Sequence, residues 1–284
     1  FGVAGTGWSG LDCMMSAVMP GDTVVVFANG TFSGIDALTL RMKASTRDEL
    51  AADSLNPQPA SVTVIDVPHG QSVTGEIVDA ALAKHKPKWA FMAHWETGSG
   101  RINDITGFSD ACLKHDAMGL VDAVSSLGVE DFAIDDHKGV VGWASCPQKG
   151  LLCLPLTYAP VSFTDRYIAS LRASGCYTYA NHPIMEARHW GVIDGKDVEK
   201  GAYHRTHSGY AVSAFHEALR IVHLDGHIEV DKACYSTPPE YVGCTVWARW
   251  DSRLVRVFND RWQQVAVHAK NLDKTSPDTM SRRW

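Results

Sequence analysis

The chain has 284 residues, of which 45% are hydrophobic and 20% are charged, a composition typical of globular proteins. Its net charge of −6 argues against the basic footprint of a nucleic-acid-binding protein, and no apolar run approaches the roughly 20 residues of a membrane span. The seven cysteines contain no CxxC pair, which disfavours a zinc site and a disulfide framework and favours reduced thiols in a reducing compartment. The sequence does not distinguish the cytoplasm from an organelle such as a peroxisome or mitochondrion.

Short apolar runs alternate with helical patterns along the first part of the chain. In chain order we predict a strand at Phe1, a helix over 8–19, strands over 23–28 and 61–67, a helix over 76–85, a strand over 89–93, a helix over 105–115, apolar runs over 118–124, 140–144 and 156–161, and a helix over 208–224. Strands separated by helices of this length imply a mostly parallel sheet with helices on both faces, an α/β fold.

Two domains are expected from the change in pattern beyond Ala173. A large domain is predicted over 1–225, followed by a partial or divergent small C-terminal α/β region over 226–284. The chain begins with Phe1, directly in a predicted strand, so we expect the natural N-terminal segment to be missing.

A lysine and an aspartate follow apolar runs of the predicted sheet. Lys149 lies in Ser145-Cys146-Pro147-Gln148-Lys149-Gly150, and Asp122 lies near the end of the run before it. Ligands of such sheets gather at the carboxyl ends of the strands. A lysine amine can form a Schiff base with an aldehyde cofactor, and a carboxylate can hold a protonated pyridine nitrogen. In isolation, a salt bridge or helix cap explains Asp122 equally well, and most lysines are solvated, so the combination carries the prediction.

The segment Gly5-Thr6-Gly7-Trp8-Ser9-Gly10 fits the GxGxxG pattern ahead of a predicted helix. Such a loop can present backbone N–H groups to a phosphate. A dinucleotide site also needs an acidic residue about 20 positions on, and the second strand ends at Ala28-Asn29-Gly30 without one. The motif therefore favours a single phosphate over a nicotinamide dinucleotide, with a tight strand-to-helix turn as an equal explanation of the motif alone.

A third loop, His94-Trp95-Glu96-Thr97-Gly98-Ser99-Gly100, follows the strand predicted over 89–93. Its glycines and small hydroxyl residues permit close approach to a ligand. Without the other motifs, an ordinary surface loop would be favoured. His94 is expected to be packed or exposed rather than a metal ligand, because no second ligand stands at a suitable spacing beside it. No metal site is predicted.

Together these segments resemble the class V pyridoxal-phosphate aminotransferases, in particular the alanine/serine–glyoxylate branch. The resemblance covers about the first 225 residues and is carried by Gly5–Gly10, Pro20–Phe32, Glu96–Gly100, Val121–Gly128 and Gln148–Leu151, with a weaker match at Tyr203–Thr206. The segments Val-Asp-Ala-Val-Ser-Ser-Leu-Gly and Gln-Lys-Gly-Leu are fairly specific at this mutual spacing. The resemblance implies a pyridoxal-phosphate transferase type I fold and pyridoxal 5'-phosphate as cofactor.

The resemblance also implies roles for individual residues. Lys149 would form the internal aldimine and shuttle a proton, and Asp122 would hold the pyridine nitrogen. Phe32 would stack on the ring and Val124 would pack beneath it. The phosphate would be cradled by Thr6, Gly7 and Trp8 with a further contact from Gln148, and Thr97 would bond the phenolic oxygen or a neighbouring group. Tyr203 and Thr206 would reach the phosphate in the neighbouring subunit, which implies a homodimer with a shared active site.

The implied reaction moves an amino group from a small amino acid (alanine, serine or aspartate) to a 2-oxo acid such as glyoxylate or pyruvate. Alternatives are another class V enzyme (a 2-aminoethylphosphonate transaminase, or a lyase or desulfurase) and a non-catalytic relative. The chain departs from the family pattern at Ser145-Cys146-Pro147, at Arg205 where the family has a second histidine, and at Ser208 where it has proline. The arginine that binds the substrate carboxylate has no clear match, and Arg253 and Arg256 are its possible stand-ins.

Overall fold

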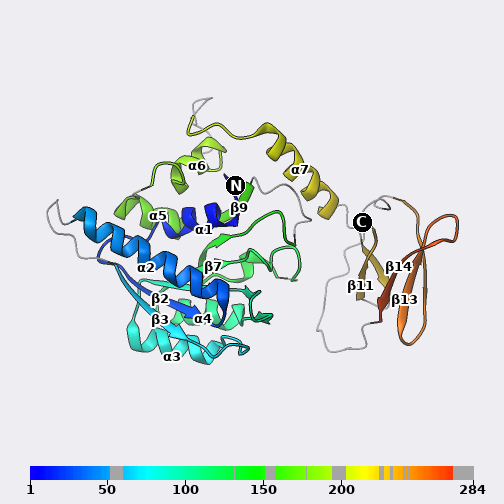
Figure 1. Ribbon diagram of the computed structural model, residues 1–284, viewed down its shortest axis with the longest axis horizontal. Helices are drawn as coiled ribbons and strands as arrows, with labels where there is room; N and C mark the ends of the chain where they lie inside the picture. Colours follow the sequence, from blue (N-terminus) through cyan, green and yellow to red (C-terminus); the bar gives the residue numbers. More distant parts are fainter. Residues whose placement is uncertain are drawn as a thin grey trace. The chain divides into compact units, whose positions relative to one another are not determined.

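The predicted apolar runs form the strands of one β-sheet in the computed structural model, which describes residues 1–51, 60–130, 132–150, 158–176, 178–193, 203–223, 227–230, 233–238, 241 and 244–270 (Figure 1). The chain divides into two compact units, a large unit over Phe1–Phe215 and a C-terminal unit over His216–Trp284. The boundary falls within helix α7 (Gly209–His223). None of the helices in these ranges combines the length and apolarity needed to cross a bilayer.

The sheet of the large unit is mostly parallel. Among the described residues its seven strands lie in the order β1-β9-β8-β7-β4-β2-β3. Neighbours from β8 to β3 pair in parallel, whereas β9 is antiparallel to β8 and β1 is antiparallel to β9. The strands are β1 (Gly2–Ala4), β2 (Thr23–Ala28), β3 (Ser61–Asp66), β4 (Trp89–Ala93), β7 (Met118–Asp122), β8 (Val140–Ala144) and β9 (Tyr158–Phe163). Every residue of β4, β7 and β8 is buried, which explains why these strands are continuous apolar runs.

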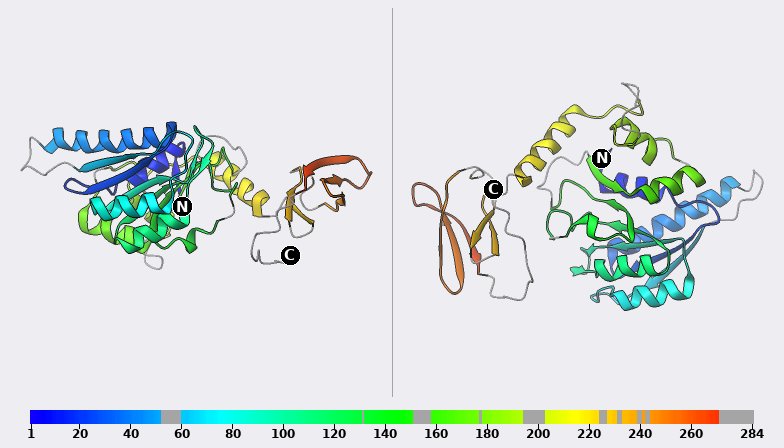
Figure 2. Two further views of the ribbon diagram at one scale, coloured as in Figure 1. Left: turned by 90° about the horizontal axis from the view of Figure 1, so that it is seen from below. Right: turned by 180° about the vertical axis from the view of Figure 1, so that it is seen from behind.

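Helices cover both faces of this sheet, as Figure 2 shows for α2 on one side and α3 and α4 on the other. Alternation along β2 divides the core, because Val24 packs with α1, α2 and α5 and Val25 packs with α3 and α4. The helices of the large unit are α1 (Gly7–Met15), α2 (Thr31–Ala51), α3 (Gly75–His85), α4 (Ile105–Lys114), α5 (Asp165–Ser174) and α6 (Pro183–His189). A short hairpin of β5 (Trp95–Glu96) and β6 (Arg101–Ile102) follows β4, and a 3₁₀ turn covers Ile134–Asp136.

The C-terminal unit is built from antiparallel strands. One hairpin pairs β10 (His227–Val230) with β11 (Ala233–Ser236), and a separate sheet has the order β12 (Trp247–Trp250), β13 (Leu254–Phe258) and β14 (Gln264–Ala269). Val230, Tyr235 and Val255 form its buried core, with Ala248 packed against them. The described part of this unit thus has a hydrophobic cluster of its own.

The mostly parallel α/β fold predicted for the large unit is confirmed, with differences in individual elements. The first helix ends at Met15 rather than at residue 19, because the Ser16 hydroxyl donates to the Cys13 carbonyl at 2.6 Å and the chain turns there. The long helix α2 was not predicted. Its first turn contains serine and glycine and is stabilised by a carboxylate from a distant strand, a contact that no local pattern reveals.

Asp104 joins the N-termini of two helices on the same sheet face. Its carboxylate accepts from the Gly107 amide of α4 at 2.9 Å and from the Gly75 amide of α3 at 3.1 Å. We expect Asp104→Ala to lower the free energy of unfolding by about 1 kcal/mol, as is usual for a lost N-cap, measured by urea denaturation followed by circular dichroism. Asp110→Ala, an exposed control on α4, should leave the unfolding midpoint unchanged. Equal midpoints for the two variants would contradict this role of Asp104.

Candidate active site

The candidate residues gather at the edge of the sheet where its parallel strands end. Asp122, the last residue of β7, lies opposite Ala93 of β4 and Ala144 of β8 in the strand register. Phe32 follows β2 in the first turn of α2, and Thr97 follows β5. The structure therefore places the segments that follow β2, β5 and β7 at one edge of the sheet.

Asp122 is a nearly buried carboxylate, with 8% of the residue exposed. Its Oδ1 accepts from the Val124 amide at 2.7 Å. Burial raises the pKa of Asp122 to about 7; the Val124 amide opposes this rise, Glu96 adds to it, and the Lys149 ammonium opposes it. A cation beside this buried carboxyl would be stabilising, because pairing with a positive charge would offset the cost of burying the carboxylate.

Lys149 lies in a turn that begins directly after β8 and is anchored to the Asp122 strand. The Ser145 hydroxyl donates to the Ala123 carbonyl at 2.8 Å, and the Cys146 thiol lies 3.5 Å from the Val124 carbonyl. Lys149 itself is exposed, and its charge is near enough to lower the pKa of Asp122. The Gln148 Oε1 atom is buried and accepts no hydrogen bond from any described residue. The Lys149 side chain thus lies near the Asp122 carboxyl, and Gln148 before it carries a buried amide oxygen with no partner among the described residues.

The loop predicted to bind a phosphate begins helix α1 against the same edge. Thr6 is the N-cap residue, and its side chain makes no capping hydrogen bond. Gly7 is required by close packing, because a Cβ at this position would lie 3.0 Å from Cγ2 of Val124 and 3.3 Å from Cβ of Cys146. Trp8, the next residue, is 42% exposed. The Ser9 amide donates to the Thr6 carbonyl at 2.8 Å, and the Thr6 hydroxyl with the Gly7 and Trp8 amides lies at the positive end of the helix, where an anion can bind.

Glu96 is a site residue to which the sequence analysis gave no role. It is fully buried, and its carboxylate accepts from the Phe32 amide at 3.2 Å, from the Ser33 amide at 2.7 Å and from the Ser33 hydroxyl at 2.6 Å. The Gly98 amide donates to it at 2.8 Å. Burial acts to raise the pKa of Glu96, but these hydrogen bonds outweigh it and hold the pKa below its ordinary value. Glu96 thereby caps α2 and fixes Phe32, whose side chain is 39% exposed at the start of that helix.

Asp36 is a second carboxyl that the sequence analysis did not identify. It lies one helical turn after Phe32, is fully buried, and neither carboxyl oxygen has a hydrogen-bond partner within the described ranges. Burial raises its pKa well above the ordinary value, and the charges of Asp122 and Glu96 act in the same direction. Burial and the two neighbouring charges therefore favour the uncharged form of Asp36. An acidic residue within an unpredicted helix gave no sequence signal for this position.

The remaining predicted residues fall into two groups. The Thr97 hydroxyl lies 2.6 Å from the Ser125 hydroxyl, which joins the β5 and β7 loops. Tyr203 and Thr206 form a separate pair, with their hydroxyl oxygens 3.2 Å apart and both side chains exposed. Among the described residues, no hydrogen bond or ion pair connects this pair to Asp122 or Lys149 of the same chain.

His94 is a packed histidine rather than a metal ligand. It is 3% exposed, and its ring meets the Phe132 ring edge-on at a centroid distance of 4.7 Å. Burial, with a contribution from His137, lowers the pKa of His94 to about 4, so the ring is neutral at pH 7. Within the described ranges, no group of three or more His, Cys, Asp or Glu side chains could hold a metal ion.

The donor set fits a phosphorylated pyridine aldehyde. The buried Asp122 carboxyl suits a protonated ring nitrogen, and the exposed Lys149 amine suits the aldehyde carbon. Phe32 offers an exposed aromatic face, and the α1 N-terminus offers amides to a phosphate. The Gln148 side-chain oxygen has no hydrogen-bond partner among the described residues, so it can accept a hydrogen bond from a ligand.

Comparisons with known proteins give the two parts of the chain different relatives. Alanine–glyoxylate aminotransferase of Oryctolagus cuniculus is 27% identical over 221 residues, which are 78% of this chain and 52% of that protein. The crystal structure of ureidoglycine–glyoxylate aminotransferase from Bacillus subtilis has a TM-score of 0.68 at 23% identity and covers 80% of this chain and 53% of that one. The chain therefore spans about half the length of the aminotransferases it matches.

Residues 209–278 match a different family, the Mu transposase C-terminal domain. Transposase y4bL/y4kJ/y4tB of Sinorhizobium fredii is 40% identical over 60 residues, which are 21% of this chain and 11% of that protein. The segments that carry the aminotransferase resemblance all precede the boundary at Phe215. In sequence the large unit is similar to the glyoxylate aminotransferases, and in fold it is similar to their solved structures.

Proposed function

We propose that the large unit carries a pyridoxal-phosphate-dependent transaminase site, which moves an amino group from alanine, serine or aspartate to a 2-oxo acid such as glyoxylate or pyruvate. The observation that carries this proposal is the buried Asp122 carboxyl beside the exposed Lys149 amine at the ends of adjacent parallel strands. The names of the relatives, which are glyoxylate aminotransferases, support the choice of acceptor.

Each residue has a separable task in this proposal. When bound, pyridoxal phosphate supplies a ring that withdraws electrons from the substrate. Lys149 holds the cofactor covalently and moves the proton at the substrate α-carbon, while Asp122 keeps the ring nitrogen protonated. Phe32 stacks on the ring, and Val124 packs on its other face. Glu96 keeps Phe32 in position through its bonds to the first turn of α2.

The test is the absorbance spectrum of the purified chain with pyridoxal 5'-phosphate. The proposal predicts a visible band that alanine shifts, that glyoxylate restores, and that borohydride removes while labelling Lys149. Failure to form any band would contradict the proposal and leave a non-catalytic relative. A band that amino acids do not shift would favour another class V reaction.

Desulfuration is disfavoured by the state of the nearest described thiol. Burial raises the pKa of Cys146 to about 11, against the opposing effects of the Lys149 and Gln148 amides, so little thiolate is present at pH 7. Cys153 lies outside the described residues.

The C-terminal unit, we infer, has an ancestry separate from that of the large unit. Its match to a transposase domain and its own hydrophobic cluster support this inference. Two arginines of this unit, Arg253 and Arg256, are proposed to bind the carboxylate of the substrate. Arg256 already contacts Asp251 at 3.1 Å.

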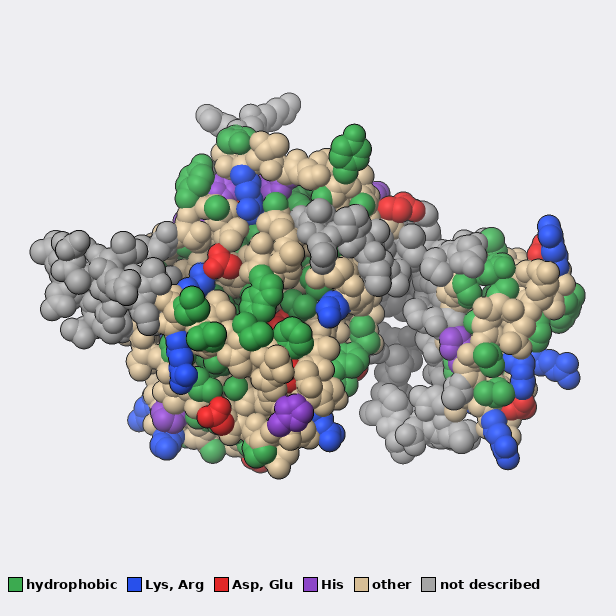
Figure 3. All heavy atoms as spheres, in the orientation of Figure 1, with side chains coloured by type: hydrophobic (Ala, Val, Ile, Leu, Met, Phe, Trp, Pro, Cys, Tyr) green, Lys and Arg blue, Asp and Glu red, His purple; other side chains and the backbone are tan. Residues whose placement is uncertain are grey.

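A homodimer is also proposed, and the exposed face of α2 supports it. Hydrophobic side chains are visible on the face of the molecule that carries α2 (Figure 3). Along this helix Phe32, Ile35, Leu38 and Met42 are 39%, 37%, 54% and 61% exposed, at spacings that place them on one side. Such a stripe on a folded domain marks an interaction surface, and its first member is the residue assigned to the cofactor ring.

We expect the double variant Leu38→Glu/Met42→Glu to convert a dimer into a monomer in light scattering at micromolar concentration, because two charges would be buried at the interface. Leu113→Glu, at a 50% exposed leucine of α4, is the matched control and should remain dimeric. Mixing Lys149→Ala subunits with Tyr203→Phe/Thr206→Val subunits should restore activity, because a mixed dimer would contain one intact shared site. A wild-type monomer, or no restoration on mixing, would contradict the shared site.

A further inference from the structure

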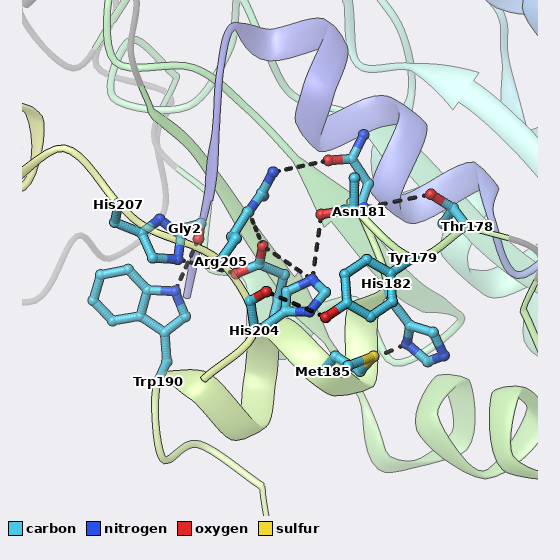
Figure 4. A network of polar contacts seen from close by, with 12 residues as sticks. Gly2, Thr178, Tyr179, Asn181, His182, Met185, Trp190, His204, Arg205 and His207 are labelled. Atoms are coloured by element: carbon cyan, nitrogen blue, oxygen red, sulfur yellow. Dashed lines mark hydrogen bonds and ion pairs between the residues drawn. The ribbon is translucent and has the colours of Figure 1, made fainter. Parts of the chain in front are cut away.

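The segment from Tyr203 to His207 is held by a buried carboxylate, that of Glu186 in α6. Figure 4 shows Arg205, His204 and His207 converging with the polar groups around them. Arg205 Nε forms an ion pair with Glu186 Oε1, and Nε2 of His204 and of His207 lie 3.6 and 3.4 Å from its two oxygens. Three of the five residues in this segment therefore face one side chain that is fully buried.

Arg205 supplies the positive charge in this cluster. Burial lowers the pKa of His204, and it lowers the pKa of His207 to about 4, with Arg205 acting in the same direction on both. Both rings are therefore neutral at pH 7, whereas a guanidinium remains charged. Burial raises the pKa of Glu186, and Arg205 opposes that rise. Arg205 is also the residue that replaces the second histidine of the family pattern.

The ion pair is connected to the helix that begins at the phosphate loop. Arg205 donates to Asn181 Oδ1 at 3.3 Å, and Asn181 donates to Asp12 of α1 at 2.8 Å. The Tyr179 hydroxyl donates to the His204 carbonyl at 3.5 Å, which holds the backbone of the segment. The segment is thus attached to α6 and, through Asn181, to α1.

The residues between these anchors point outward. Tyr203 is 69% exposed and Thr206 is exposed, whereas His204 between them is 3% exposed. The Tyr203 and Thr206 hydroxyls lie 3.2 Å apart, a spacing at which two donors can meet oxygens of one phosphate. Because His204, Arg205 and His207 turn toward Glu186, the Tyr203 and Thr206 hydroxyls are left together at the surface.

We propose that Glu186 and Arg205 are positioning residues, whose buried ion pair holds the Tyr203 and Thr206 hydroxyls together as a phosphate-binding pair presented to the cofactor of a second copy of this chain. This inference rests on the homodimeric transaminase function proposed above. Loss of Arg205 would leave an uncompensated buried carboxylate, which would move toward water and release the segment. Loss of the Glu186 charge would free the Arg205 side chain to turn to solvent.

The experiment measures the dissociation constant of pyridoxal 5'-phosphate by titration of the visible band. Arg205→Ala, Glu186→Gln and Tyr203→Phe/Thr206→Val should each weaken binding at least about tenfold, the loss of one or two charge-assisted contacts. Adding Arg205→Ala to the hydroxyl variant should weaken binding no further, because the same contact has already been lost. Arg205→Lys should recover part of the affinity. Arg166→Ala, which breaks the exposed pair with Asp116, and Tyr210→Phe, at a 92% exposed tyrosine, are controls that should bind like wild type.

The outcomes separate this inference from the proposed function. A wild-type chain without the visible band would overturn the transaminase proposal itself. Normal cofactor affinity in Arg205→Ala and Glu186→Gln, with only a lowered melting temperature, would overturn the positioning role while the function stands. Fully additive losses in the combined variant would also overturn it, since they would show that Arg205 acts independently of the two hydroxyls.

Discussion

Lys149→Ala is expected to abolish the visible band with pyridoxal 5'-phosphate and to lower transamination by at least about a thousandfold. The amine is both the covalent attachment point and the group that moves the proton, and general acid–base catalysis alone contributes about 10²- to 10⁴-fold. The residue is exposed, so the substitution should leave the melting temperature within about 1 °C of the wild-type value. Absorbance, single-turnover rate and melting temperature should all be measured on the same preparation.

Lys138→Ala is the matched control, because Lys138 is an exposed lysine two residues before β8. It should retain the band and the rate. Borohydride followed by peptide mapping should label Lys149 in the wild type and in this control, and no lysine in Lys149→Ala. Labelling of another lysine in the wild type would contradict the assignment of the site.

Asp122→Asn is expected to stabilise the cofactor-free chain at pH 8 and to impair the loaded enzyme. The pKa of the buried carboxyl is raised to about 7 from an ordinary value near 3.8. The contribution of Asp122 to the free energy of unfolding is therefore largest below pH 3.8. It is lost as the pH rises through 7 and stays low above pH 7. The change is at most about 4 kcal/mol, since one pKa unit corresponds to about 1.4 kcal/mol.

The same substitution should lower transamination by at least about a hundredfold, because an amide cannot hold a protonated ring nitrogen as a carboxylate does. Urea unfolding of the cofactor-free chain at pH 5 and pH 8 should show a wild-type loss of stability that is smaller in Asp122→Asn. Asp135→Asn, at an exposed aspartate, should keep the wild-type pH dependence and rate. Equal pH dependence in wild type and Asp122→Asn would show that Asp122 is not the titrating group.

The parallel strands could be predicted from the sequence because strands buried on both faces appear as continuous apolar runs. The runs ending at Ala28, Ala93, Asp122 and Ala144 are apolar except for Thr23 and Asp122 at their ends, and buried strands of a parallel sheet require such runs. Once the strands are parallel and adjacent, their carboxyl ends meet at one edge, so the polar residues that follow them are brought together. For this reason the sequence alone predicts that Asp122 and Lys149 lie at the same edge of the sheet.

Helix α2 and the carboxyls around it could not be found in this way. The first turn of α2 depends on Glu96, which is 63 residues away from Ser33 along the chain. The local sequence of α2 therefore does not reveal this contact. Likewise, the raised pKa of Asp36 arises from burial and from two charges on other strands. Intrinsic helix propensity is a weak predictor, and tertiary contacts override it here.

The sequence by itself determined the order of the sheet-forming runs of the large unit, the edge where ligands gather, and the residue types that stand there. Only the tertiary structure decided in which direction the pKa of each buried carboxyl shifts and which surface the Tyr203 and Thr206 hydroxyls occupy. It also decided that Arg205 pairs with Glu186. The physical reason is that burial and charge are summed over all neighbours in space, whereas periodicity reports only neighbours along the chain.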